Sequence, residues 1–172
     1  MVIYTIGHST HPIDEFIDML ASFGVKQLVD IRTLPGSTRQ PQFNQEDLGP
    51  SLKAVDIDYV YLKKLGGLRK KTSDSVNLGW RNLSFRNYAD YMQTDDFKSA
   101  LGRLTELAED KVTAIMCAEA VPWRCHRSLV ADALQVRGIE VSHIMTKNKA
   151  NPARLTPFAK VSGQNITYPS EA

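Results

Sequence analysis

The sequence lacks the features that mark several specialised classes of protein. It has only two cysteines in 172 residues, too few for the disulfide framework of a small secreted domain. No apolar run approaches the roughly 18–20 residues needed to cross a bilayer. The first six residues are apolar but lack the basic region of an export signal, so we expect a strand there. These absences predict a cytoplasmic protein with reduced thiols and no membrane partner.

The remaining sequence alternates between short apolar runs and helix-spaced apolar patterns. Strands are expected over residues 2–6, 27–31, 59–62, 112–117 and 140–144. Helices are expected from residue 10 or 11 to 24, from 44 or 45 to 55, and over 85–93, 96–109 and 124–137. Ser84 and Asp95 are the expected N-caps of the third and fourth helices. The alternation predicts a single-domain, three-layer Rossmann-like α/β sandwich with a mostly parallel five-stranded sheet.

The predicted domain covers residues 1–145 and includes an irregular basic insertion at 63–84. Residues 146–172 contain Pro152, Pro157, Gly163 and Pro169, which predict an extended C-terminal tail. In the common strand order 3-2-1-4-5, strands 1 and 4 are neighbours and flank the point where the order reverses. Residues 7–9, 30–32 and 117–119 would then meet at the carboxyl edge of the sheet, where ligands bind.

The segment from Cys117 to Arg127 concentrates reactive side chains in one strand-to-helix turn. It holds both cysteines together with Glu119 and His126. A thiol, a carboxylate and cations at the carboxyl edge of a sheet indicate chemistry on an anionic substrate.

Several short motifs in this chain resemble the domain-of-unknown-function 488 family. They are Thr5-Ile-Gly-His-Ser9, Leu28-Val-Asp-Ile-Arg-Thr-Leu-Pro35, Leu65-Gly-Gly67, Cys117-x-Glu119 with Cys125-His-Arg127, and Arg137-Gly-Ile-Glu-Val-Ser-His143. The resemblance runs in order over about residues 2–145. It implies a shared fold and a shared site, but no settled reaction.

Ten residues are candidates for the site. Catalytic candidates are Glu119, Cys117, His8 and His126, and candidates for binding the anion or substrate are Ser9, Asp30, Arg32, Arg124, Cys125 and Arg127. Cations and a helix N-terminus would lower the pKa of the Cys117 thiol, and Glu119 is an alternative base or nucleophile. The structural alternatives are a core cysteine, an ion pair of Arg127 with Asp30 or Glu119, and a pair between Asp30 and Arg32 alone.

No cofactor or metal is expected. The first strand is not followed by a Gly-x-Gly-x-x-Gly motif, so a dinucleotide cofactor is unsupported. Cys117 and Cys125-His126 do not have a usual zinc-ligand spacing. A regulatory disulfide between the two cysteines stays an alternative, and with it a role as a redox sensor.

Positive charge is concentrated in residues 63–86. The net charge of the chain is only +2, but this block holds seven Lys and Arg residues against one acid, Asp74, with Trp80 and Phe85 available for stacking. The alternative function is therefore a nucleic-acid-binding accessory module. The preferred hypothesis is an enzyme, a transferase or hydrolase with a Glu or Cys nucleophile. It would act on a nucleotide, a nucleic-acid component or another phosphorylated small molecule.

Overall fold

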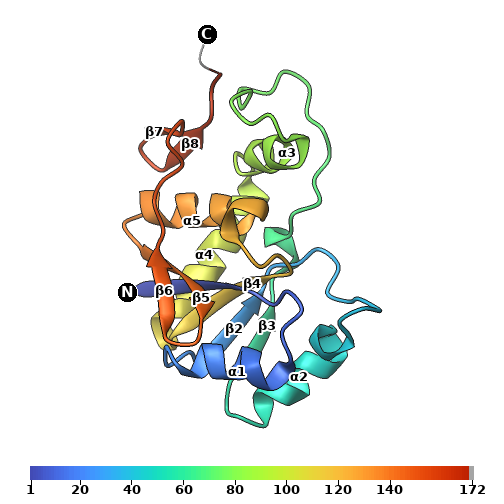
Figure 1. Cartoon of the computed structure of the whole chain (residues 1–172). Helices are drawn as coiled ribbons and strands as arrows, with labels where there is room; N and C mark the ends of the chain where they lie inside the picture. Colours follow the sequence, from blue (N-terminus) through green and yellow to red (C-terminus); the bar gives the residue numbers. More distant parts are fainter. Residues whose placement is uncertain (171–172) are drawn as a thin grey trace.

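The computed structural model describes residues 1–170 and shows a central sheet with helices on both faces (Figure 1). The sheet has six strands in the order β3-β2-β4-β1-β5-β6. They are β1 (Val2–Gly7), β2 (Gln27–Asp30), β3 (Asp58–Tyr61), β4 (Thr113–Cys117), β5 (Glu140–Thr146) and β6 (Lys149–Pro152). All pairs are parallel except β5 with β6. The predicted three-layer α/β sandwich is confirmed, with one strand more than expected.

The strand order differs from the expected 3-2-1-4-5 in one respect. β4 pairs with both β1 and β2, so it lies between them. β1 and β4 are still neighbours, as expected, and their register places Gly7 opposite Cys117. On the other side of β4, Asp30 lies opposite Met116. The carboxyl ends of the first, second and fourth strands therefore meet at one edge.

Each face of the sheet carries its own core because successive strand residues point to opposite faces. α1 (Ile13–Ala21) and α2 (Gln45–Lys53) pack on the face that contains Ala114 and Met116. α3 (Leu83–Tyr91), α4 (Asp95–Asp110) and α5 (Arg127–Val136) pack on the face that contains Ile115.

The helix boundaries follow the sequence pattern, but the caps differ. Asn82, and not Ser84, caps α3 by accepting hydrogen bonds from the amides of Ser84 and Phe85. Thr94, and not Asp95, caps α4. A short 3₁₀ turn, η3 (Pro122–Arg124), precedes α5, which therefore begins three residues later than expected.

Residues 146–170 hold more structure than an extended tail. β6 extends the sheet, and β7 (Lys160–Ser162) pairs with β8 (Asn165–Thr167). Buried Asp132 on α5 accepts hydrogen bonds from the Thr156 amide at 3.0 Å, the Thr156 hydroxyl at 2.7 Å and the Tyr168 hydroxyl at 2.8 Å. Asn77 accepts from the Tyr168 amide, so residues 66–82 are tied to the same segment. The division at residue 145 stays a prediction.

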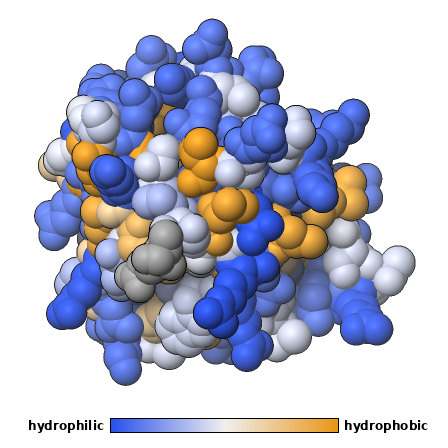
Figure 2. All heavy atoms as spheres, turned by 90° about the horizontal axis from the view of Figure 1, so that it is seen from above, coloured by the Kyte–Doolittle hydropathy of each residue, from blue (hydrophilic) through white to orange (hydrophobic). Residues whose placement is uncertain are grey.

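Residues 66–83 form much of the upper part of Figure 1 and carry several exposed apolar side chains: Leu68, Val76, Leu78 and Leu83. Figure 2 looks down on this face, where apolar side chains lie in small groups among hydrophilic ones. Within residues 1–170, no helix combines the length and the apolar character that a membrane span requires.

Candidate functional site

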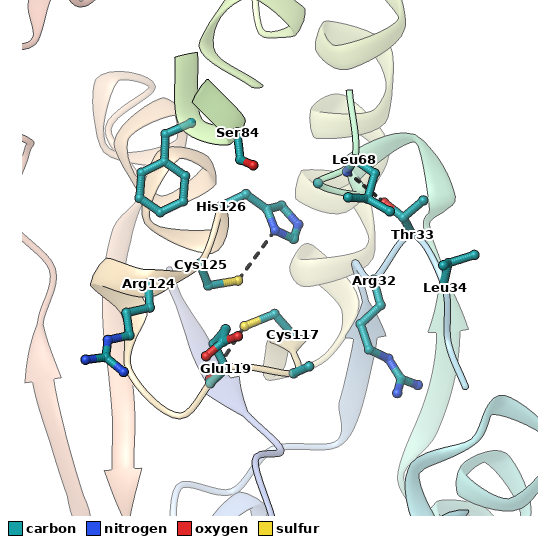
Figure 3. A pocket seen from close by; sticks show the side chains of 13 residues that line it. Arg32, Thr33, Leu34, Leu68, Ser84, Cys117, Glu119, Arg124, Cys125 and His126 are labelled. Atoms are coloured by element: carbon teal, nitrogen blue, oxygen red, sulfur yellow. Dashed lines mark hydrogen bonds between the residues drawn. The ribbon is translucent and has the colours of Figure 1, made fainter. Parts of the chain in front are cut away.

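A pocket of about 360 Å³ opens at the carboxyl ends of β2 and β4 (Figure 3). Six of the ten candidate residues line it: Arg32, Cys117, Glu119, Arg124, Cys125 and His126. Residues 67–68 and the start of α3 form its opposite wall. His8, Ser9, Asp30 and Arg127 do not line the pocket. Three of these four, all but Ser9, are buried side chains that contact the residues lining it.

Arg127 lies beneath the pocket with none of its side chain exposed to solvent. Its Nη1 donates to Cys117 Sγ at 3.0 Å and to the Glu119 carbonyl at 2.7 Å, and its Nη2 donates to the Ala120 carbonyl at 3.3 Å. No carboxylate within residues 1–170 forms an ion pair with it. A guanidinium stays charged at any ordinary pH, so the Cys117 sulfur is the one group among these contacts that is able to carry a compensating charge.

The electrostatics of the two thiols differ although both are buried. Burial by itself raises the pKa of Cys117, but the hydrogen bond from Cys125 and the charge of Arg127 outweigh it, so that the pKa is lowered. Burial and the neighbouring Cys117 raise the pKa of Cys125 well above its usual range. In Figure 3 the two sulfur atoms lie next to each other between Arg124 and Arg32. Of the two thiols, Cys117 is therefore the one that ionises more readily, and Cys125 is the one that keeps its proton.

His126 is held as a neutral imidazole. Its Nε2 donates to the Ile31 carbonyl at 3.0 Å, which leaves Nδ1 as an acceptor 3.4 Å from Cys125 Sγ, so Nδ1 competes with Cys117 for the single Cys125 proton. Burial lowers the pKa of His126 to about 4. Gly67 lies against the same ring, where an added Cβ would come within 2.8 Å of Nδ1. His126 therefore joins β2 to the turn and orients Cys125, and both of its nitrogens are occupied.

Gly7 allows the buried guanidinium to reach its partners. A Cβ on this residue would lie 1.6 Å from the Glu119 carbonyl oxygen and 2.5 Å from Arg127 Nη1. The next two residues continue the pairing with the turn, since the amide of His8 donates to the Cys117 carbonyl and that of Ser9 to Ala118. Ser9 has a positive φ of 45°. The Gly-His-Ser motif thus sets the close approach of β1 to the turn after β4.

Asp30 and Arg32 form a buried ion pair beside the pocket. Arg32 Nε donates to Asp30 Oδ1 at 2.9 Å and its Nη2 to Oδ2 at 2.8 Å, while Nη2 also donates to the Phe43 carbonyl. Tyr59 donates its hydroxyl to Asp30 Oδ2 at 2.5 Å. These hydrogen bonds pair the Arg32 guanidinium with acceptors of the protein itself, so it has little capacity left to bind a ligand. Tyr59 and Phe43 were not among the predicted site residues, because nothing but their apolar character distinguishes them in the sequence.

His8 completes this cluster. Its Nδ1 donates to the Ser9 carbonyl at 2.9 Å, so Nε2 accepts from Arg32 Nη1 at 3.3 Å. Its ring stacks on Phe43 with centroids 4.4 Å apart. Burial lowers its pKa. His8 is therefore a neutral ring that supports Arg32.

Glu119 and Arg124 are the exposed charges at the rim of the pocket. Within residues 1–170 neither side chain forms an ion pair. Figure 3 shows Glu119 beside Cys117 and Arg124 extending away from the cysteines. The remaining wall is apolar, with Leu34, Leu68 and Phe85. The site thus has a floor of two buried thiols, an apolar wall, and one exposed charge of each sign at its rim.

The basic segment 63–86 is more firmly packed than a solvated loop. Arg69 donates to the carbonyls of residues 63, 64 and 66 and lies 3.6 Å above the Tyr91 ring. Trp80 packs against Phe85, Phe158 and Tyr168, with the Phe158 ring centroid at 4.8 Å. The Trp80 ring is thus occupied by contacts within the protein. The exposed cations of this segment are Lys63, Lys64, Lys70, Lys71 and Arg81.

Within residues 1–170, no three His, Cys, Asp or Glu side chains are arranged to hold a metal ion. In comparisons with known proteins, a family model described as "Domain of unknown function DUF488" matches residues 12–134. No curated protein and no solved structure matches the chain.

Proposed function

Because the chain belongs to the DUF488 family, whose description names no reaction, we propose a function from the geometry of the pocket. The protein is an enzyme in which the Cys117 thiolate is the nucleophile. Its substrate is an anionic small molecule: a nucleotide, a nucleic-acid component or another phosphorylated compound.

The buried guanidinium of Arg127 is the observation that carries this proposal. Burying a cation without a counter-charge costs several kcal/mol, and Cys117 Sγ, at 3.0 Å, is the contact that supplies one when it is ionised. A core cysteine would need no such cation. Cys117, although only 2% exposed, also lines the floor of a pocket that is open to solvent. Perturbed ionisation inside a pocket is typical of a reacting group.

The chemistry follows from these positions. The thiolate electron pair forms a bond to the electrophilic atom of the substrate, and the bond to the leaving group breaks with its electron pair on that group. The leaving group takes a proton from water at the open rim. A second nucleophile, water or an acceptor molecule, then forms a bond to the same atom and gives its proton to the Glu119 carboxylate, while the bond to sulfur breaks and restores the thiolate.

Arg124 is the proposed partner of the substrate anion. Arg32 is saturated by Asp30 and the Phe43 carbonyl, and Arg127 is covered by protein. Arg124 is exposed at the rim without an ion pair in the described part of the chain, and an exposed side chain changes rotamer in nanoseconds.

Alkylation of the thiols tests the proposal. Iodoacetamide should modify Cys117 rapidly at about pH 6, where an ordinary thiol is almost wholly protonated. Peptide mapping should find the label on Cys117 in the wild type and in Cys125→Ser, and none on Cys125 in Cys117→Ser. A labelling rate that rises only near the ordinary thiol pKa would refute an activated Cys117.

Redox sensing is a second candidate, favoured by the adjacent sulfurs of Cys117 and Cys125. Two-electron oxidation by a peroxide or a disulfide would join the two sulfurs, and the oxidant would take up the two electrons and the Cys125 proton. Treatment with glutathione disulfide should then remove both free thiols without attaching glutathione. A stable mixed disulfide at Cys117 would exclude the intramolecular bond and keep the nucleophile.

Nucleic-acid binding by segment 63–86 is less favoured because Arg69 and Trp80 serve the fold. Its test changes Lys70, Lys71 and Arg81 to Ala and retains Arg69. If the segment binds single strands, the triple variant should lose most of the affinity, and wild-type binding should weaken steeply between about 50 and 200 mM salt. Unchanged affinity in that variant would exclude this role.

A further inference from the structure

The only two tryptophans of the sequence both line a second pocket, of about 480 Å³. This pocket lies on the other side of η3 from Cys117, because Pro122 and Trp123 line the second pocket while Arg124 and Cys125 line the first. Its volume falls in the range typical of small-molecule sites.

Three large aromatic side chains, Trp80, Trp123 and Phe158, line the second pocket. Trp123 is 65% exposed, although an indole normally gains by burial. Across the pocket lining, Trp80 and Phe158 pack edge to face with centroids 4.8 Å apart and an interplanar angle of 71°. An exposed indole at the rim and a fixed aromatic pair in the wall suit a flat ring better than a flexible chain.

The second pocket is preorganised by the segment between β6 and β7. This segment runs alongside α5 in Figure 1 and contributes Ala153, Arg154, Thr156 and Phe158 to the lining. The amide of Ala153 donates to the Val141 carbonyl at 2.9 Å, and Thr156 makes two hydrogen bonds to Asp132. A wall held in this way loses little further entropy when a ligand binds.

The polar groups of the lining indicate the charge of the ligand. His143 Nδ1 shares a 2.6 Å hydrogen bond with Thr5 Oγ1, which leaves Nε2 without a partner in residues 1–170. Burial lowers the pKa of His143 to about 4, so the ring is neutral at physiological pH. Arg154 is exposed and forms no ion pair in the described part of the chain. The lining contains no Asp or Glu, so it complements an anion.

We propose that this second pocket binds a planar aromatic molecule that carries an anionic group. The ring lies against Trp123, and the anion pairs with Arg154. The proposal does not rest on the chemistry of Cys117. The anionic group is either a phosphate, as in a nucleotide, or a carboxylate on an aromatic acid, and the two are separated by experiment.

The test titrates the full chain with adenosine monophosphate and with 2-naphthoate by calorimetry, with adenosine and inorganic phosphate as partial ligands. We expect at least one of the two complete ligands to bind, and the partial ligands to bind at least about tenfold more weakly. Because Trp80 and Trp123 are the only indoles, binding of the nucleotide should also change the tryptophan emission. The Trp123→Phe variant assigns that change to the exposed ring.

Matched variants locate the ligand. Trp123→Ala and Arg154→Ala should each weaken binding about tenfold or more, and both side chains are exposed enough for the fold to survive. Arg103→Ala is the matched control, because this exposed arginine lines neither pocket, and it should leave binding unchanged. Absence of binding by both complete ligands at about millimolar concentration would overturn the proposal. The proposal would also be overturned if Arg124→Ala lost binding while Trp123→Ala and Arg154→Ala retained it, because the ligand would then lie in the pocket of Cys117. Alkylation of Cys117 is independent of these outcomes.

Discussion

Acid sensitivity is the sharpest stability prediction that the structure makes. His126 has an ordinary pKa of 6.5 in the unfolded chain, and burial lowers it to about 4 in the fold. Below pH 6.5 the unfolded state therefore binds a proton that the folded state does not, and the free energy of unfolding falls as the pH falls. The loss continues down to about pH 4 and then stops. At 1.36 kcal/mol per pH unit, His126 alone accounts for about 3 kcal/mol.

The same argument applies to His143, whose pKa burial also lowers to about 4. Two such groups remove a large part of the 5–15 kcal/mol by which a typical domain of this size is stable. Urea unfolding, followed by circular dichroism between about pH 7 and pH 4, measures the effect.

His126→Gln removes the titration and retains a side-chain N–H for the Ile31 carbonyl. Whatever its stability at pH 7, this variant should lose about 3 kcal/mol less than the wild type on acidification. The control is His11→Gln, because His11 lies at the surface near Glu15, and it should follow the wild type. If His126→Gln and the wild type lose stability in parallel, the ring is not buried in its neutral form and the reasoning fails.

Three further predictions concern stability and ionisation. Gly7→Ala should cost several kcal/mol or prevent folding, since its Cβ would overlap the Glu119 carbonyl. Gly102→Ala, on α4 with no atom within 4 Å of the added Cβ, should instead stabilise by about 0.5–1 kcal/mol; equal effects in thermal unfolding would contradict the contact at Gly7. Tyr168→Phe should cost about 1–3 kcal/mol by removing a donor to buried Asp132, and an unchanged melting temperature would show that this bond does not anchor the tail. Because the pKa of Cys117 is lower in the folded than in the unfolded state, its ionisation stabilises the fold. This contribution to the free energy of unfolding is fully present above the ordinary thiol pKa and is lost as the pH falls through the pKa of the folded state. The gap in unfolding free energy between wild type and Cys117→Ser should therefore widen towards pH 9, and a constant gap would refute a thiolate.

Local patterns were sufficient to predict the layers of the fold. Buried strands such as residues 113–117 are continuous apolar runs, and the helices show one apolar stripe each, so their type and order follow from periodicity. β6 could not be predicted in this way, because Lys149-Ala-Asn-Pro152 has no apolar alternation and becomes a strand only by pairing with β5. The one available signal for a turn before β6 was Asn148, because asparagine is favoured in turns, and its φ in the structure is 62°.

The topology was sufficient to predict that the candidate site residues lie close together, but not which side chains bind one another. Strand ends share an edge, so residues after β1, β2 and β4 had to converge. Side-chain partners depend on angles and burial that a sequence does not encode locally. Arg127 is the clearest case, because arginine is almost never fully buried. Its contact with a thiol in place of a carboxylate has no counterpart in residue spacing.

The covered guanidinium also affects how long any adduct at Cys117 lasts. Once the sulfur has formed a covalent bond it is neutral, and Arg127 is left with only the carbonyls of Glu119 and Ala120. The adduct is therefore raised in energy relative to the free thiolate, and expelling the sulfur restores the pair. Under the proposed function, this cation makes Cys117 a good leaving group as well as a nucleophile, which favours turnover over permanent capture of the substrate.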